Sequence, residues 1–239
     1  MIPKIIHYCW FGRGEMPELA LKCIASWHKF MPDYEYKLWN EDSFDVNAVP
    51  YTKESYEARK FAFVSDYVRL WALCNEGGVY LDTDVEVFRP FDDLLNLKAF
   101  AGFEGSKHLP VGTCVMASEA NGLWVKEQME GYQGRHFKKT DGSYDLTTNV
   151  QFITARMNEQ GFVQDGQEQV YKDLHVFPVD YFSPRQTTGE YLRTTNTYSD
   201  HLGLGSWAES SRGWKAVVKK MFGQRIMICL IKLKRKLFG

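Results

Sequence analysis

The stretch GGVYLDTDVE, residues 77–86, places Asp82 and Asp84 two positions apart within an apolar run. A buried carboxylate without a partner is costly, and two neighbouring carboxylates repel each other. On a continuous strand both would project from the same face about 7 Å apart, and if the strand ends or bends there both could reach one cation. Mg²⁺ and Mn²⁺ are commonly held by one or two carboxylates plus substrate phosphates. The spacing therefore suggests a divalent metal site, with a solvated polar strand face as the alternative.

The segment before this stretch carries a second pair of charged residues. Residues 56–75 are expected to form a helix that a Gly-Gly pair ends. Asp66 and Arg69 lie on one side of it at the i,i+3 spacing that permits an ion pair. Because the turn into the following strand is tight, both could face the same crevice as Asp82. An ordinary surface ion pair is the alternative.

Strand-like and helix-like segments alternate along the first part of the chain. This alternation predicts an α/β fold with a mostly parallel, doubly wound sheet. Residues 182–207 show little periodicity and are expected to form a long loop, of the kind that often binds ligands. The expected strands are 4–11, 34–39, 79–88, 99–104, 113–118 and 175–179, and the other expected helices are 18–30, 121–132 and 148–160.

Charge is distributed unevenly over the 239 residues. The last 30 residues hold nine of the 29 Lys and Arg residues and none of the 30 Asp and Glu residues. Residues 1–209 therefore have 20 basic against 30 acidic residues, which argues against general nucleic-acid binding. Residues 211–239 have the pattern of a basic amphipathic helix. We expect it to lie on an anionic membrane surface, with docking on the acidic body as the alternative.

The cysteines and the N-terminus indicate the compartment. The five cysteines are odd in number and none are paired at metal-ligand spacing, which is typical of buried thiols in a reducing compartment. The N-terminal apolar run is short and interrupted, unlike a signal peptide. No apolar stretch reaches the roughly 18–20 residues of a membrane span. We expect a cytoplasmic protein, peripheral on the inner face of the cytoplasmic membrane if the tail binds there.

Three segments together resemble the sugar-binding DXD glycosyltransferases of family 32. They are IPKIIHYCWFG, FVSDYVRLWALCNEGGVYLDTDVEVF and HLGLGSW. This family is related to initiating mannosyltransferases, α-1,4-galactosyltransferases and the catalytic domains of the large clostridial glucosylating toxins. The resemblance covers about residues 2–105 and returns at 201–207. It implies a GT-A fold over residues 1–210, a nucleotide-diphosphate sugar donor, a divalent metal and retention at the anomeric carbon.

The resemblance also assigns roles to residues on the donor side. Trp10 would stack on the nucleobase, and Tyr80 would support the ribose or phosphates. Asp66 would bond hydroxyls of the donor sugar, and Arg69 would contact that sugar or the diphosphate. Asn149 occupies the position of a sugar- or acceptor-facing turn, although many relatives have Gly-Pro there and Asn is also a good helix N-cap.

The remaining assignments concern the metal and the diphosphate. Asp84 would bind the metal directly, and Asp82 would contact the ribose and sugar while reaching the metal through water. His201 is a further candidate near the metal or phosphates. Ser206 and Trp207 would close over the diphosphate. For each tryptophan and histidine a purely structural role is the alternative.

These expectations lead to a metal-dependent retaining hexosyltransferase. It would use Mn²⁺ or Mg²⁺ and move a hexose or N-acetylhexosamine, from a UDP-sugar in preference to a GDP-sugar. The acceptor would be a lipid-linked glycan of a bacterial capsule, O-antigen or lipooligosaccharide. The alternatives are a phosphatase of the haloacid-dehalogenase type with Asp82 as nucleophile, a toxin-like enzyme that modifies protein, or a non-catalytic nucleotide- or sugar-binding module.

Overall fold

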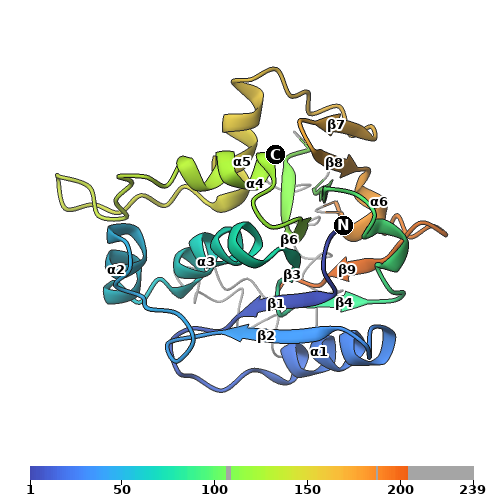
Figure 1. The fold of residues 1–239 in the computed structure, drawn as a ribbon, viewed down its shortest axis with the longest axis horizontal. Coiled ribbons are helices and arrows are strands. Elements are labelled where there is room, and N and C mark those ends of the chain that lie inside the picture. The colour runs from blue at the N-terminus through green and yellow to red at the C-terminus, as the bar shows by residue number, and fades with distance from the viewer. Residues whose placement is uncertain (106–108, 187, 204–239) are drawn as a thin grey trace, which may run out of the picture. The chain divides into compact units, whose positions relative to one another are not determined.

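The computed structural model describes residues 1–105, 109–186 and 188–203, and these form one α/β unit. Its principal sheet has seven strands in the order β2-β1-β3-β6-β5-β8-β7 (Figure 1). The elements in chain order are β1 Ile5–Cys9, α1 Glu18–Phe30, β2 Glu35–Trp39, α2 Pro50–Glu57, α3 Phe61–Glu76, β3 Gly78–Leu81, β4 Val85–Val87, a 3-10 turn at Asp92–Leu94, β5 Ala99–Phe103, β6 Val111–Ser118, α4 Leu123–Glu130, α5 Asn149–Asn158, β7 Gln169–Tyr171, β8 Leu174–Phe177, α6 Val179–Phe182 and β9 Ser199–His201.

The expected mostly parallel sheet is confirmed. Strand β1 pairs in parallel with β2 and β3, and β5 pairs in parallel with β8. Strands β6 and β7 run antiparallel to their neighbours. Five of the seven strands in the described part of the chain therefore run in one direction.

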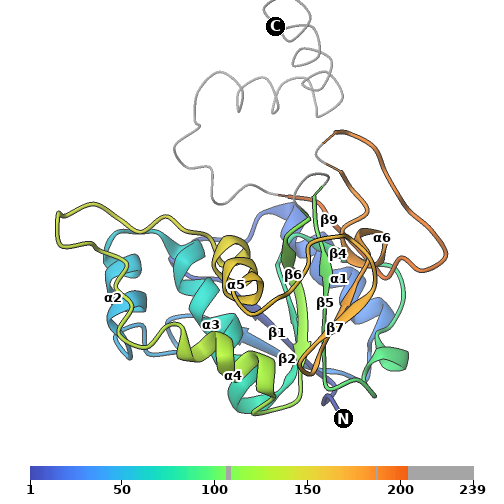
Figure 2. The same ribbon diagram turned by 90° about the horizontal axis from the view of Figure 1, so that it is seen from above.

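Helices cover both faces of the sheet, as Figure 2 shows for α3, α4 and α5 on one face and α1 and α6 on the other. Side-chain alternation along β3 separates two apolar cores accordingly. Tyr80 belongs to the core under α3, whereas Val79 and Leu81 belong to the core under α1. Because β3 is packed on both faces, the polar residues that follow it are held by a rigid strand.

The connection from α3 to β3 depends on the Gly-Gly pair. Gly77 ends α3 with a φ of +69°, and Gly78 follows with a φ of +114°. A side chain at position 78 would start 2.7 Å from the carbonyl oxygen of Ile5, so β1 and β3 could not pair as they do. The Gly77 carbonyl also accepts a hydrogen bond from buried His7, whose other ring nitrogen accepts one from the Trp39 indole. His7 is thus a structural histidine of this connection.

Three predictions about the elements were wrong. Residues 79–88 do not form one strand: β3 stops at Leu81, residues 82–84 turn, and β4 joins a separate two-stranded sheet with β9. The helix expected over 56–75 is divided into α2 and α3 at Arg59, which has a φ of +56°. The loop expected over 182–207 contains β9. The sequence of β9, SDH, is polar and lacks the apolar alternation typical of a strand, and the segment is a strand because it pairs with β4.

Candidate active site

The turn at residues 82–84 is fixed by main-chain hydrogen bonds at both ends. The Asp82 amide donates to the carbonyl of Cys114 on β6 at 2.9 Å, and the Val85 amide donates back to the Asp82 carbonyl at 3.0 Å. The Leu202 amide, just beyond β9, donates to the Asp84 carbonyl at 2.9 Å. The bend that these contacts create replaces the continuous strand face, and it brings both carboxylates beside β9.

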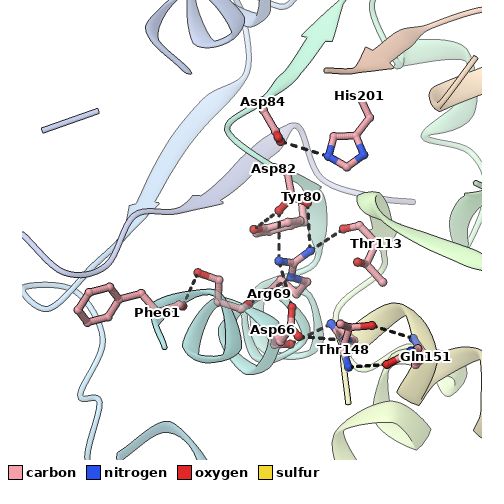
Figure 3. Close-up of polar contacts among 12 residues, drawn as sticks. Phe61, Asp66, Arg69, Tyr80, Asp82, Asp84, Thr113, Thr148, Gln151 and His201 are labelled. Carbon is pink, nitrogen blue, oxygen red and sulfur yellow. Dashed lines mark hydrogen bonds and ion pairs between the residues drawn. The ribbon is translucent and has the colours of Figure 1, made fainter. Parts of the chain in front are cut away.

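Arg69 lies at the centre of a buried polar network behind this turn (Figure 3). Its guanidinium is 3.2 Å from Asp82 Oδ1 and 3.3 Å from Asp66 Oδ1. It also donates to the carbonyls of Thr113 and Ser65, at 2.8 and 3.2 Å. Its side chain is only 3% exposed. Although burial lowers the pKa of Arg69, the adjacent Asp82 carboxylate, Tyr80 and Asp66 outweigh it and raise the pKa well above its usual value.

Tyr80 completes the hold on Asp82. Its hydroxyl donates to Asp82 Oδ1 at 2.9 Å, and its ring lies 4.5 Å from the Arg69 guanidinium. Burial raises the pKa of Tyr80 well above its usual value, so the hydroxyl stays protonated and remains a donor. Each oxygen of Asp82 thus has a partner, Oδ1 with Tyr80 and Arg69, and Oδ2 with Arg69.

Asp66 and Asn149 are joined across the helices that carry them. The Asn149 amide donates to Asp66 Oδ2 at 3.0 Å, and its side chain donates to the Asp66 carbonyl at 3.1 Å. Asn149 is the first residue of α5, which begins with a capping box made by Thr148 and Gln151. Burial raises the pKa of the fully buried Asp66 to about 7, although Arg69 opposes this. Thr148, and not Asn149, is therefore the N-cap of α5. Asn149 instead contacts Asp66, which pairs with Arg69.

On the other side of the turn, Asp84 meets His201 of β9. The distance from Asp84 Oδ1 to His201 Nε2 is 3.3 Å, and β4 and β9 pair at Val85 and His201. Burial lowers the pKa of His201, but contacts with Cys114 and Asp84 outweigh it and raise the pKa well above its usual value. The carboxylate of the turn and the imidazole of β9 are thus brought together from positions 117 residues apart.

The donor set at this edge suits a divalent cation. Asp82, Asp84 and His201 each offer one ligand atom, and these atoms lie within 4.8 Å of one another. Two carboxylates and an imidazole match the preferences of Mn²⁺, and oxygen-rich sets suit Mg²⁺. A bound cation would also offset the repulsion between two acidic side chains in one turn.

Two neighbouring residues join this edge. Glu104, which follows β5, and Cys114 of β6 also place ligand atoms within 4.8 Å of His201 and of each other. Burial raises the pKa of Glu104, and the Asp82 and Asp84 carboxylates add to this while His201 opposes it. We expected a buried thiol at Cys114, but no pattern in the sequence signals its proximity to His201, because the two lie on strands of different sheets.

The other predicted site residues are placed as follows. Trp10 directly follows β1, and its partly exposed side chain donates from its indole nitrogen to the Gly14 carbonyl at 2.6 Å. Ser206, Trp207 and the basic segment 211–239 lie outside the described residues. In the described part of the chain, no helix is long and apolar enough to cross a bilayer.

Comparisons with known proteins show which sequences this region of the chain resembles. Residues 17–101 match a family model for the glycosyltransferase sugar-binding region containing a DXD motif. The chain is 37% identical over 103 residues to inositol phosphoceramide mannosyltransferase 3 of Schizosaccharomyces pombe, which covers 41% of this chain and 29% of that protein. It is 31% identical over 104 residues to the mannosyl phosphorylinositol ceramide synthase CSH1 of Saccharomyces cerevisiae, covering 42% of this chain and 27% of that protein. The chain thus spans less than a third of the length of these relatives.

A comparison of structures concerns the fold. The PaToxG glycosyltransferase superposes with a TM-score of 0.52 at 17% identity, over 67% of this chain and 70% of that one. The expected GT-A fold is confirmed, and so is the family resemblance. Residues 17–101 are thus similar to the sugar-binding region of the DXD-motif glycosyltransferases, and the chain has a GT-A fold.

Proposed function

We propose that this chain is a metal-dependent retaining glycosyltransferase that uses a nucleotide-diphosphate sugar. The proposal rests on one observation: the ligand atoms of Asp82, Asp84 and His201 lie within 4.8 Å of one another at a turn where Arg69 pairs with Asp82. This donor set fits Mn²⁺ or Mg²⁺, and the family of the matching region has a DXD motif for sugar binding.

The two aspartates would have unequal tasks. Asp84 and His201 would hold the cation directly. Asp82, whose oxygens are engaged by Arg69 and Tyr80, would face the donor's ribose and sugar and reach the cation through water. The bound cation would supply Lewis-acid neutralisation of the charge on the leaving diphosphate.

Arg69 and Asp66 act as positioning residues in this proposal. Arg69 is 3% exposed and Asp66 is fully buried, and within the protein they contact Asp82 and Asn149. The direct contacts with the donor that the family resemblance implies for both residues remain part of the proposal. Trp10 remains our candidate for stacking on the base, and Ser206 and Trp207 for covering the diphosphate.

The same contacts support a stereochemical route for the proposed transfer. Retaining glycosidases use a carboxylate nucleophile. Here Asp66 is fully buried and both oxygens of Asp82 are bonded within the protein. We therefore favour front-face attack, in which the acceptor hydroxyl approaches on the side that the diphosphate leaves and passes its proton to a leaving phosphate oxygen. The same bonds speak against Asp82 as the nucleophile of a phosphatase.

The donor would be a UDP-hexose or UDP-N-acetylhexosamine, and the acceptor a lipid-linked glycan of a bacterial surface polysaccharide. The two fungal relatives are named for mannosyl transfer involving a ceramide lipid, which supports a lipid acceptor and adds mannosyl donors to the candidates. In this proposal the basic segment 211–239 would bring the enzyme to an anionic membrane surface.

The test is a screen of UDP- and GDP-sugars for donor hydrolysis and transfer, with and without Mn²⁺, on the wild type and Asp84→Asn. A cation that stabilises the transition state by several kcal/mol corresponds to roughly 10²–10⁴-fold in rate. We expect Asp84→Asn to lose that much activity and the nucleotide-dependent thermal shift in Mn²⁺, while keeping its circular dichroism spectrum. Full activity in this variant would contradict the metal role, and no thermal shift of the wild type with either nucleotide would favour a different class of protein.

A further inference from the structure

Beside the Asp82–Asp84 turn lies a second set of three ligand atoms, from Glu104, Cys114 and His201. These atoms lie within 4.8 Å of one another. The residues come from three separate elements: Glu104 follows β5, Cys114 is within β6 and His201 ends β9. The function proposed above uses His201 but leaves Glu104 and Cys114 without a task.

The two sets differ in chemistry although they share His201. Asp82 and Asp84 offer carboxylate oxygens, which suit hard cations such as Mg²⁺ and Mn²⁺. Cys114 adds a sulfur, and the combination of thiolate, imidazole and carboxylate is the ligand set that Zn²⁺ uses in proteins. Three protein ligands with a fourth position left for water are typical of zinc sites that are not purely structural.

The packing around the second set holds its ligands in place. Cys114 is 3% exposed, its Sγ lies 3.3 Å from the Ser183 hydroxyl, and its carbonyl accepts the Asp82 amide. Position 112 is a glycine, and a side chain there would start 2.9 Å from Glu104 Oε2. The absence of that side chain leaves the Glu104 carboxylate its space. Hydrogen-bonded ligands on rigid strands are what a preorganised metal site requires.

We propose that Glu104, Cys114 and His201 form a second cation site for Zn²⁺ that competes with the Asp82–Asp84 site through His201. On binding, the Cys114 thiol proton is released to solvent and the thiolate bonds to the metal. His201 is then withdrawn from the neighbouring set, so Zn²⁺ weakens Mn²⁺ binding. The existence of the zinc site is independent of the proposed function, whereas the competition rests on the metal site of that function.

Cobalt titration of the full chain tests the site itself, because Co²⁺ substitutes for Zn²⁺ and shows thiolate-to-metal charge-transfer absorption when sulfur is bound. We expect this absorption in the wild type, in Asp84→Asn and in the control Cys74→Ser, which removes a thiol on α3. We expect its loss in Cys114→Ala and Cys114→Ser. Retention of the band in both Cys114 variants, or its absence from the wild type, would overturn the proposal. Loss of the band in Asp84→Asn would also overturn it, because that result would indicate one merged site.

Glu104→Gln provides a second route if the Cys114 variants fail to fold. Glu104 is partly exposed, so its replacement should disturb the core less than replacement of the buried Cys114. Loss of a ligand should weaken cobalt binding at least as much as loss of a ligand's hydrogen-bond partner, roughly 10–100-fold. An unchanged cobalt affinity would remove Glu104 from the site and contradict the proposal.

Electron paramagnetic resonance of Mn²⁺ tests the competition without any enzymatic assay. In the wild type, Zn²⁺ should release bound Mn²⁺, and in Cys114→Ala the zinc concentration needed should rise roughly tenfold or more. Equal zinc sensitivity in the two proteins would overturn the competition. If the wild type binds no Mn²⁺, the metal role in the proposed function fails and the competition with it, while the cobalt band still decides the existence of the second site.

Discussion

The two sides of the Asp82–Asp84 turn compensate their charges in different ways. Towards α3, the carboxylates of Asp66 and Asp82 face Arg69, which is 3% exposed and bonded to protein oxygens. Towards β9, the ligand atoms of Asp84 and of Glu104 each lie near His201, and both Glu104 and His201 are partly exposed. The buried side is held by the chain's own cation, whereas the ligand set on the β9 side suits a cation taken from solution. We expect substitutions on the two sides to separate stability from metal binding.

The largest effect on stability is expected from Arg69→Met. Breaking a buried ion pair by removing one partner typically destabilises a protein by about 3–5 kcal/mol, because the remaining charge is buried without compensation. Here two carboxylates, Asp66 and Asp82, lose their cation. Urea unfolding monitored by tryptophan fluorescence would measure this loss.

The matched variant on the other side is Asp84→Asn. It removes the charge that pairs with His201, but it also relieves the repulsion from neighbouring Asp82 and keeps the shape, so we expect the free energy of unfolding to change by about 1 kcal/mol or less. A loss from Asp84→Asn equal to that from Arg69→Met would show that the two sides do not differ in the way described.

The second effect is the pH dependence that Asp66 contributes on the buried side. Burial raises the pKa of Asp66 from an ordinary 3.8 to about 7, so the folded state binds a proton that the unfolded state has released between these values. Stability from this group is therefore full below about pH 4 and falls as pH rises to about 7. Each pKa unit is worth about 1.4 kcal/mol, so the fall amounts to a few kcal/mol.

The Asp66→Asn variant should not show this loss of stability between about pH 4 and pH 7. Unfolding of the wild type and the variant in urea, at intervals between pH 4 and pH 8, would give the difference that isolates Asp66 from other titrating groups. Parallel pH curves for the two proteins would contradict the raised pKa.

A smaller loss of stability than that from Arg69→Met is expected from Tyr80→Phe, which keeps the ring under Arg69 and removes the hydroxyl that donates to Asp82. A hydrogen bond to a charged group contributes about 1.5–3 kcal/mol, and we expect the lower end because Arg69 still holds Asp82. Tyr132→Phe is the control, since its hydroxyl donates to the neutral Asn149 amide oxygen at 3.3 Å. If thermal unfolding shows that Tyr132→Phe loses more stability than Tyr80→Phe, this would argue against a charged acceptor for the Tyr80 hydroxyl.

Much of the buried side could be predicted from the sequence because its contacts are local. Asp66 and Arg69 are one helical turn apart, and the Gly-Gly pair joins their helix closely to β3. Helix periodicity and turn chemistry act over a few residues, so a single sequence reveals them. Burial of this pair was not predictable, since periodicity alone equally allowed a surface ion pair.

The metal side was less predictable because it depends on pairing between distant segments. His201 reaches Asp84 only because β9 pairs with β4, and β9 has a polar sequence without strand periodicity. Glu104 and Cys114 arrive from β5 and β6, which have their own places in the larger sheet. Such proximity depends on long-range strand pairing, which no local pattern encodes.

By itself the sequence determined the alternation that produces an α/β sheet, the Gly-Gly turn, the acidic pair at 82 and 84, and the resemblance of their pattern to a glycosyltransferase family. Only the tertiary structure decided that the strand breaks at Asp82, that Arg69 is enclosed, and that Glu104 and Cys114 lie beside His201, which was already a candidate from the family resemblance. The physical reason is the distance along the chain over which each effect acts. Side-chain period and backbone propensity act within a few residues, whereas the bend and the ligand set depend on hydrogen bonds from β6 and β9 to residues 82–85.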